Sequence, residues 1–427
     1  MKETRSSETA SSAPQSGLRA LVGSVFTGDR VLWIIIAALA VISVLVVYSS
    51  TAKRAYDAHT ARSTAHFLRQ QVGILILCVP IIVIVHKINC RVYNRLAQPV
   101  YVLSLLLTLA VYFIGATTNG AARWIPVAGF QFQPSEALKV ATILLLARRL
   151  SSCQSKIDRI RIVPSLNPFR WGRPAQRKIW REGTRPILLP VVLSCAVIFP
   201  AHTSSAMLVF LTSLVMMLIG RVRVSELVRL VGLACAALLL AGLLNLGRSE
   251  TAGGRVSTWI DLWTSSQTEK PIDRLTDTER SMIAIHNGGL LGEGAGQSAM
   301  RVEMIHPESD YAYAFFVEEY GIILAGILLM LYLWIFFRAR EIFVRCGTAF
   351  PGLLVLGLAL MITCQALLHV MVTVNLMPET GQTLPLISRG GSSVLFTVIA
   401  LGMILSVSRQ NDEHSHDTPR SESIYEK

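Results

Sequence analysis

Residues 31–50 read VLWIIIAALAVISVLVVYSS, a run without a charged side chain. An α-helix rises 1.5 Å per residue, so about 20 apolar residues are enough to cross the hydrocarbon core of a bilayer. The polar segment before this run is longer than the charged start of a signal peptide, and no small-residue cleavage site follows the run. The stretch predicts a retained first transmembrane helix, preceded by a disordered segment at 1–30.

The rest of the chain continues this pattern. The 427 residues are 52% hydrophobic and 16% charged, with a mean hydropathy of +0.50, whereas soluble domains carry about 25% charged residues. We therefore expect an all-α polytopic membrane protein with ten transmembrane helices in a single membrane domain at 31–408. The predicted spans are 31–50, 71–86, 98–115, 135–150, 186–201, 204–220, 226–246, 312–337, 349–374 and 391–408.

Charge in the predicted loops orients these spans. The segment 148–186 contains eleven lysines and arginines but only two acidic residues, so the positive-inside rule makes it cytoplasmic. Both termini are then cytoplasmic, including a disordered tail at 409–427. The segment 247–311 becomes a large extracytoplasmic loop between the seventh and eighth helices. One loop, 51–70, is basic although this orientation makes it external.

Charge and cysteine content exclude other classes of protein. The formal net charge of +13 is concentrated on cytoplasmic flanks that face anionic lipid, so a nucleic-acid partner is not expected. None of the seven cysteines falls in a predicted external loop and no CxxC motif occurs. We therefore expect neither disulfides nor a metal–thiolate site.

Three predicted external stretches are unusual for loops. In NGAARWIPVAGFQFQPSEALKV (119–140), Glu136 and Lys139 lie three residues apart on one helical face and can form an ion pair. Alternatively, Lys139 or Arg123 binds an anionic headgroup. The second stretch, within 247–310, has a glycine-rich run that predicts a shaped re-entrant loop. A phosphate cradle is the weaker interpretation, because the lysine of a P-loop is missing.

The third stretch is NLMPETGQTLPLISRGGSSVLF (375–396). Its prolines and glycines predict irregular backbone, which survives at membrane depth only when it is buried in protein or lines a wet cavity. Upstream, Gln365, His369 and Thr373 recur on one helical face, and His369 is expected to make an interhelical hydrogen bond. Together the three stretches predict one water-filled cavity that opens toward the outer face.

Three carboxylates stand close together in the run SDYAYAFFVEEYG (309–321). Asp310 is predicted at the membrane surface, where it is either a functional carboxylate or an ordinary helix N-cap. Glu318 and Glu319 lie roughly 12 Å deeper along a helix. Because a charged side chain inside a bilayer costs at least about 2.5–3.5 kcal/mol, these two glutamates are expected to be paired within the bundle.

Four stretches together resemble one known family. NGAARWIP…QPSEALK, SMIAIHNGGLLGEGAGQS, SDYAYAFFVEEYG and MPETGQTLPLISRGGSS occur in this order within 31–410. They are similar to the signatures of the SEDS family, the bacterial shape, elongation, division and sporulation proteins typified by FtsW and RodA. The resemblance implies a ten-helix protein of the bacterial inner membrane that polymerises lipid II alongside a class B penicillin-binding protein. It also implies that Asp310 is the catalytic aspartate and that Glu136 and Lys139 form a buried ion pair.

Three positions depart from the family pattern. The stretch PAHTSSA (200–206) has no acidic residue directly after the proline, Arg389 stands where an aromatic residue is usual, and Tyr311 follows Asp310 in place of phenylalanine. None of these changes removes a proposed catalytic group. Arg389 does add a cation near the predicted cavity.

The implied reaction needs one base and several cations. Polymerisation joins a sugar 4-hydroxyl to an anomeric carbon with inversion, and undecaprenyl pyrophosphate leaves. A hydroxyl is a poor nucleophile until a base takes its proton, and cations stabilise a departing pyrophosphate. Asp310 is the predicted base, and Mg²⁺ or Mn²⁺ is a candidate cofactor. The predicted substrate-binding groups are Arg255, Lys139, Arg301, Arg123 and the turn at positions 391 and 392, which are Gly391 and Ser392.

Other functions remain open at this level. A lipid II flippase would also have intramembrane charges and broken segments, but it would place polar groups along both halves of the membrane. A scaffold that only recruits partners would leave the polar cavity unexplained. Within the family, the long polar N-terminus and the tail favour a division role, with other divisome proteins as partners, over the elongation role of a RodA-like paralogue.

Overall fold

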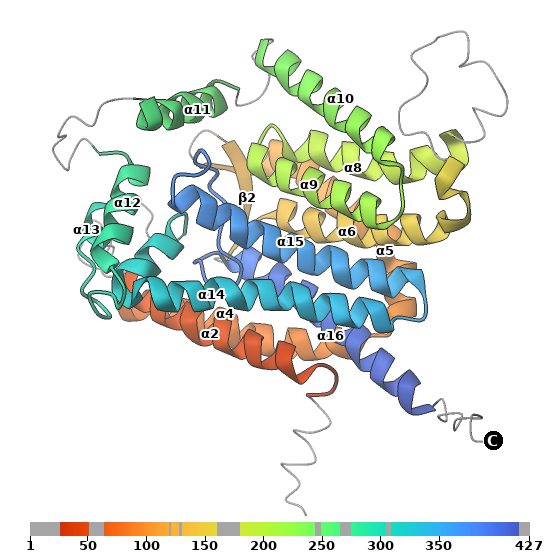
Figure 1. Ribbon diagram of the computed structural model, residues 1–427, viewed down its shortest axis with the longest axis horizontal. Coiled ribbons are helices and arrows are strands. Elements are labelled where there is room, and N and C mark those ends of the chain that lie inside the picture. Colours follow the sequence, from red (N-terminus) through yellow and green to blue (C-terminus); the bar gives the residue numbers. More distant parts are fainter. Residues whose placement is uncertain are drawn as a thin grey trace, which may run out of the picture.

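The computed structural model describes residues 26–50, 64–118, 121–127, 130–159, 180–243, 249–264, 275–304 and 309–417. Long helices that run side by side make up most of it (Figure 1). Each predicted span coincides with a helix. These helices are α2 (Arg30–Ser50), α4 (Thr64–Lys87), α5 (Cys90–Ile114), α6 (Pro134–Ser152), α8 (Arg185–Ile198), α9 (Thr203–Ile219), α10 (Val224–Leu243), α14 (Ala312–Arg345), α15 (Ala349–Thr373) and α16 (Gly391–Asp417).

Within the described residues, seven of these helices are long and apolar enough to cross a membrane by length and composition, namely α2, α4, α5, α10, α14, α15 and α16. Helix α9 is apolar but shorter, and α8 has 14 residues. Helix α6 is long enough, but Glu136, Lys139, Arg148 and Arg149 lower its hydropathy. The prediction of a multi-pass helical membrane protein is thus confirmed.

The all-α prediction is wrong in one place. A three-stranded antiparallel ribbon joins α5 to α6 and contains β1 (Ala116–Thr118), β2 (Ala121–Val127) and β3 (Phe130–Phe132). Trp124 pairs with Ala116, and Ile125 pairs with Phe132. Aromatic and β-branched residues favour strands and Pro126 opposes a helix, so the backbone groups here bond between strands instead.

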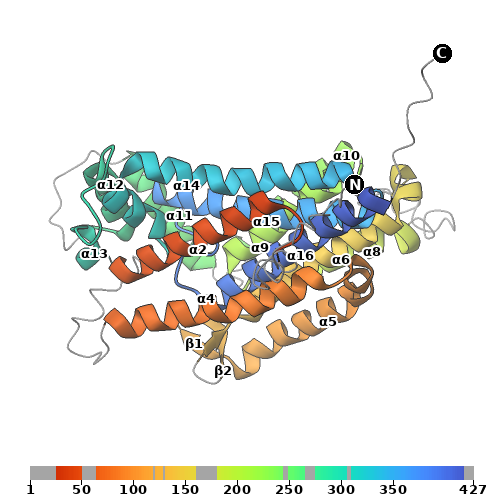
Figure 2. The ribbon, with the colours of Figure 1, turned by 90° about the horizontal axis from the view of Figure 1, so that it is seen from below.

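Consecutive long helices alternate in direction, which gathers the connections at two ends. We call one of them the loop end; it comprises residues 116–118, 121–127, 130–132, 199–202, 249–264, 275–304, 309–310 and 374–390. The start of α2 and the last turns of α16 meet at the opposite end, where a Cβ built on Gly28 would lie 3.2 Å from the backbone of Arg409. Figure 2 shows α12 and α13 at the loop end and the last turns of α16 at the other.

Helices α6 and α15 form the centre of the bundle. Every residue of α6 from Pro134 to Ala147 is buried, and α15 packs against α14, α6, α16 and α9. A helix that is apolar on all sides is expected to be surrounded by protein. The outer helices α4 and α5 instead expose apolar side chains such as Phe113, which suits contact with lipid.

Helix α10 leaves the bundle after its first turns. Its buried residues are Glu226, Leu227 and Leu230, all near its start, where Glu226 pairs with Arg229 at 2.6 Å. Beyond them the helix leans away from the other spans (Figure 1), and Leu239 and Leu243 are exposed. The loop that follows includes α11 (Ser249–Thr264), α12 (Asp277–Gly288) and α13 (Met300–Glu303).

Helix α14 is interrupted at Gly321, whose φ of 79° lies outside the helical region. The break leaves carbonyls without partners inside the helix, and the glycine-rich loop supplies them. The backbone N–H of Glu293 donates to the carbonyl of Glu318 at 2.9 Å, and that of Gly294 donates to the carbonyl of Glu319 at 3.0 Å. The predicted re-entrant loop is therefore a segment joined to a broken helix, not a free phosphate cradle.

Candidate active site at the loop end

Asp310 lies at the loop end, directly before α14. Tyr311, and not Asp310, occupies the N-cap position of that helix, and the Tyr311 side chain makes no capping hydrogen bond. The N-cap interpretation of Asp310 is therefore wrong. The carboxylate is half-buried and faces Gly381, where a built Cβ would lie 3.9 Å from Asp310 Oδ2. The aspartate predicted as the base thus faces the irregular segment between α15 and α16.

Side chains of α15 hold that irregular segment in place. Gln365 Nε2 donates to the carbonyl of Thr383 at 2.9 Å, and His369 Nδ1 bonds to the carbonyl of Gln382 at 2.7 Å. Nearby, Ser388 Oγ donates to the carbonyl of Ser309 at 2.7 Å, which fixes the residue before Asp310. The polar face predicted on α15 thus orders the wall of the site.

Glu136 and Lys139 lie together at the start of α6. Lys139 Nζ is 2.9 Å from Glu136 Oε1, and the two side chains are 1% and 10% exposed for the lysine and the glutamate. The ammonium also donates to Gln365 Oε1 at 3.0 Å. Because its ammonium is buried and already bonded, Lys139 would act on a ligand through its positive electrostatic field more than by direct contact.

The other predicted cations approach the same region from different elements. Arg255 of α11 has its Nε 4.0 Å from Glu379 Oε2, with both side chains about one-third exposed. Arg123 of β2 donates from Nε to the carbonyl of Ala201 at 2.8 Å. Arg301 belongs to α13, but its side chain lies outside the described residues.

The charges of three cations act on a buried histidine that the sequence did not single out. His202 caps the start of α9. Burial, followed by the charges of Arg123, Lys139 and Arg255, lowers the pKa of His202 to about 3. The three cations therefore act on one point, although they come from β2, α6 and α11. The sequence feature that could have pointed to this residue is the single histidine in the turn PAHTSS (200–205).

The predicted serine contact has a different role. Ser392 is fully buried; its hydroxyl accepts from the N–H of Gln133 at 2.9 Å and donates to the carbonyl of Gln131 at 2.8 Å. Gly391 has no side chain to offer a ligand. The prediction that this turn binds substrate through hydroxyls is corrected, because the described bonds of Ser392 anchor the strand before α6.

Glu318 and Glu319 are buried, and they accept hydrogen bonds from loop groups and hydroxyls. Glu318 accepts from Ser298 Oγ, from the N–H of Met300 at 3.2 Å and from Asn287 Nδ2 at 3.3 Å. Glu319 accepts from Ser49 Oγ and from the N–H of Gly296 at 2.8 Å. These glutamates hold the large loop against α14 and α2.

A divalent cation would need help from its substrate here. Among the described residues, no group of three or more His, Cys, Asp or Glu side chains could hold a metal ion. Mg²⁺ is commonly bound by one or two carboxylates together with substrate phosphates. Asp310 fits such a partial set.

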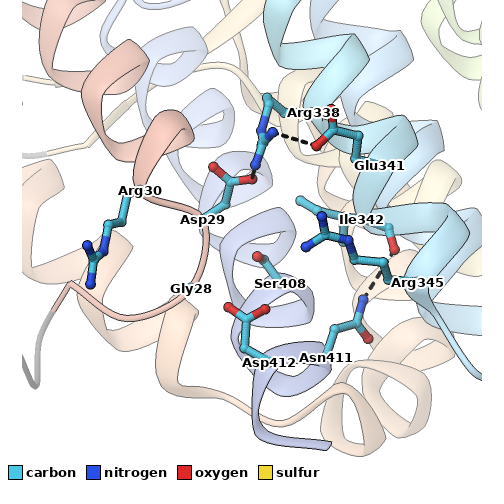
Figure 3. A pocket seen from close by; sticks show the side chains of 10 residues that line it. All are labelled: Gly28, Asp29, Arg30, Arg338, Glu341, Ile342, Arg345, Ser408, Asn411 and Asp412. Carbon is cyan, nitrogen blue, oxygen red and sulfur yellow. Dashed lines mark hydrogen bonds and ion pairs between the residues drawn. The ribbon is translucent and has the colours of Figure 1, made fainter. Parts of the chain in front are cut away.

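A separate cavity of about 240 Å³ lies at the opposite end (Figure 3). There Asp29 accepts from the N–H groups of Val31 and Leu32 and also pairs with Arg338 at 2.6 Å. Arg338 bonds in turn to Glu341. This cavity belongs to the junction of α2, α14 and α16 and not to the Asp310 site.

Comparison with known proteins identifies the family. The model of the FtsW, RodA and SpoVE family, described as cell cycle protein, matches residues 29–413. The chain belongs to this family. A probable peptidoglycan glycosyltransferase FtsW from Geobacter sulfurreducens is 27% identical over 391 residues, which cover 89% of this chain and 95% of the relative. Stage V sporulation protein E from Bacillus subtilis is 27% identical over 390 residues, 89% of this chain and 97% of that protein.

Solved structures share the fold. A chain from a study of polymerisation and crosslinking by a peptidoglycan synthase complex aligns with a TM-score of 0.65 at 24% identity, covering 90% of this chain and 99% of that one. The rod shape determining protein RodA from Thermus thermophilus aligns with a TM-score of 0.59 at 22% identity, covering 91% and 99%.

Proposed function

We propose that this peptidoglycan glycosyltransferase polymerises lipid II with Asp310 as its general base. The observation that carries this proposal is the segment from Glu379 to Gly381. Gly381 stands against the Asp310 carboxylate, and Glu379 contacts the guanidinium of Arg255. One carboxylate and a cation from another element thus face the same short stretch of chain.

The chemistry uses these groups in separate ways. Asp310 takes the proton of the attacking sugar 4-hydroxyl as the glycosidic bond forms. Undecaprenyl pyrophosphate departs from the anomeric carbon, and the positive field of Arg123, Lys139 and Arg255 stabilises its charge. A glycosidase needs a second carboxylate because its leaving group is an alkoxide, whereas pyrophosphate requires no proton. A divalent cation bound with the substrate would add to the same positive field.

The membrane arrangement that we propose has ten transmembrane helices. Helices α6, α8 and α9 cross together with the seven apolar ones, because they lie among them and alternate in direction with them. The loop end faces the extracytoplasmic side of the bacterial inner membrane and both termini are cytoplasmic. The support is the eleven basic residues of 148–186. The described flanks of that segment, the end of α6 and the start of α8, lie at the opposite end from Asp310 (Figure 1).

A class B penicillin-binding protein is the partner we propose, within a septal complex of divisome proteins. One structural neighbour comes from a study of a peptidoglycan synthase complex, and several relatives are named FtsW. An elongation role alongside a RodA-like set of partners is the alternative within the family.

The test compares purified protein with Asp310→Asn and Asp310→Ala variants on purified lipid II. Both variants should insert and fold normally, yet form no glycan, because no other group replaces the base. Asp261→Asn, an exposed aspartate of α11 in the same large loop, is the matched control and should retain activity. Wild-type polymerisation by Asp310→Ala would refute the assignment.

A further inference from the structure

His202 connects three segments of the loop end although it is far from them in the sequence. It lies in the turn between α8 and α9 and is 9% exposed. Its Nδ1 accepts from the N–H of Ser205, which caps α9. Ser204 Oγ lies 2.9 Å from the same nitrogen. The backbone of Gly381, the residue that stands against Asp310, also acts on the ring.

Gln382 completes a network around the ring. Its Nε2 lies 3.4 Å from His202 Nδ1 and donates to Ser205 Oγ at 2.8 Å and to Ser204 Oγ at 3.1 Å. Ser204 Oγ donates to the carbonyl of Thr380 at 2.7 Å. Residues 380 and 382, on either side of Gly381, are thus both bonded to the turn at 202–205.

The charge state of His202 matters as much as its bonds. The charged side chains that act on it are Arg123 of β2, Lys139 of α6 and Arg255 of α11, and these are paired in part with Glu136 and Glu379. A carboxylate at position 202 would pair with these cations and cancel part of their field. A neutral imidazole keeps the bonds described above and leaves the positive field uncancelled.

We propose that His202 is a positioning residue, which holds residues 380–382 so that Gly381 stays against Asp310, and which leaves the cation field intact for the pyrophosphate. The inference rests on the proposed role of Asp310. It assigns two separable effects to one side chain: orientation of the site wall, which acts on kcat, and neutrality, which acts on KM.

The experiment measures kcat and KM for lipid II polymerisation by His202→Ala, His202→Gln and His202→Glu. His202→Ala should lower kcat by about tenfold, equivalent to about 1.4 kcal/mol in the barrier, with KM changed less than threefold. His202→Gln, a neutral donor and acceptor, should recover kcat to within about threefold of wild type. His202→Glu should raise KM by about tenfold, because its carboxylate opposes the cations.

Two controls separate positioning from general stability. Thr212→Val removes a buried hydroxyl of the same helix that bonds to the carbonyls of Leu208 and Val209, and should leave kcat and KM unchanged. Gln382→Ala combined with His202→Ala should lower kcat by less than the product of the single effects, because both act through one network. If the kcat losses of the two single variants simply multiply in the double variant, the two residues act independently and the proposed network is wrong.

The outcomes also separate this inference from the proposed function. Activity in Asp310→Asn would refute the base and leave nothing for His202 to position. An inactive Asp310→Asn together with wild-type kcat in His202→Ala would refute the positioning role alone. If His202→Ala does not fold, equal kcat and KM in the glutamine and glutamate variants would overturn the proposal.

Discussion

Replacing Lys139 by methionine should destabilise the protein strongly, because the change strands a buried carboxylate. Lys139 Nζ lies 2.9 Å from Glu136 Oε1, and the glutamate side chain is only 10% exposed. Methionine keeps the length of the lysine stem and removes only the charge and its hydrogen bonds. Removing one partner of a buried pair typically costs about 3–5 kcal/mol. Lys139→Met also leaves Gln365 Oε1 without the donor that now bonds to it at 3.0 Å.

The assay is a double-mutant cycle with Glu136→Gln, read by thermal unfolding in detergent. Each single variant should lower Tm by roughly 5–10 °C, scaling from the few degrees per kcal/mol seen in smaller domains. The double variant should recover much of the loss, because replacing a whole buried pair by neutral groups is often close to neutral. The charge-swapped pair should recover part of it.

The matched control is Glu413→Gln, which breaks the Arg409–Glu413 pair of α16 at 2.5 Å. There the glutamate side chain is 57% exposed and Arg409 keeps its bond to the carbonyl of His86, so the loss should be no more than about 1 kcal/mol. Strictly additive effects of the Glu136 and Lys139 changes, or an equal loss in the α16 control, would refute the argument from burial.

Three other predictions concern topology, the helix break and pH. In a background without the native cysteines, an impermeant thiol reagent on spheroplasts should label a cysteine at Ser265 and spare one at Ser165; the reverse would place Asp310 in the cytoplasm. Gly321→Ala should lower Tm and activity together, because its φ is 79° and a Cβ would meet the carbonyl of Leu290 at 2.4 Å; wild-type behaviour in both measurements would contradict this. The pKa of His202 is lowered from 6.5 to about 3, so the unfolded chain binds the extra proton and stability falls by up to about 1.4 kcal/mol per pH unit below pH 6.5. His202→Gln should remove that part of the slope, and an unchanged slope would contradict it.

The apolar runs predicted the helices well because length and hydropathy are local properties. Even α6 was found, although its charges lower its hydropathy, because Glu136 and Lys139 share a helical face. The sequence did not predict the strands β1, β2 and β3, because strand pairing is not a local property. These strands are short, and their pairing depends on the two helices that bring them together.

The polar contacts of the site were much less predictable. Glu318 and Glu319 were recognised as needing partners, but those partners belong to a loop whose position follows from the break at Gly321. The contact between His202 and Gln382 joins residues 180 positions apart. No local pattern in the sequence encodes such a pair, because the packing of α9 against α15 creates it.

The distribution of polar groups along the bundle argues for a reaction at one face and against passage of a headgroup through the centre. The Glu136–Lys139 pair sits at the loop end of α6. Deeper along the same helix, Ile143 and Leu146 are fully buried, as is Leu358 of α15. A carrier of a charged headgroup needs polar groups near the midplane that both sides can reach. No Asp, Glu, Lys or Arg stands between Lys139 and Arg148 of α6 or anywhere along α15. We therefore infer that the substrate is bound and released on the Asp310 side, where the base and the cations are.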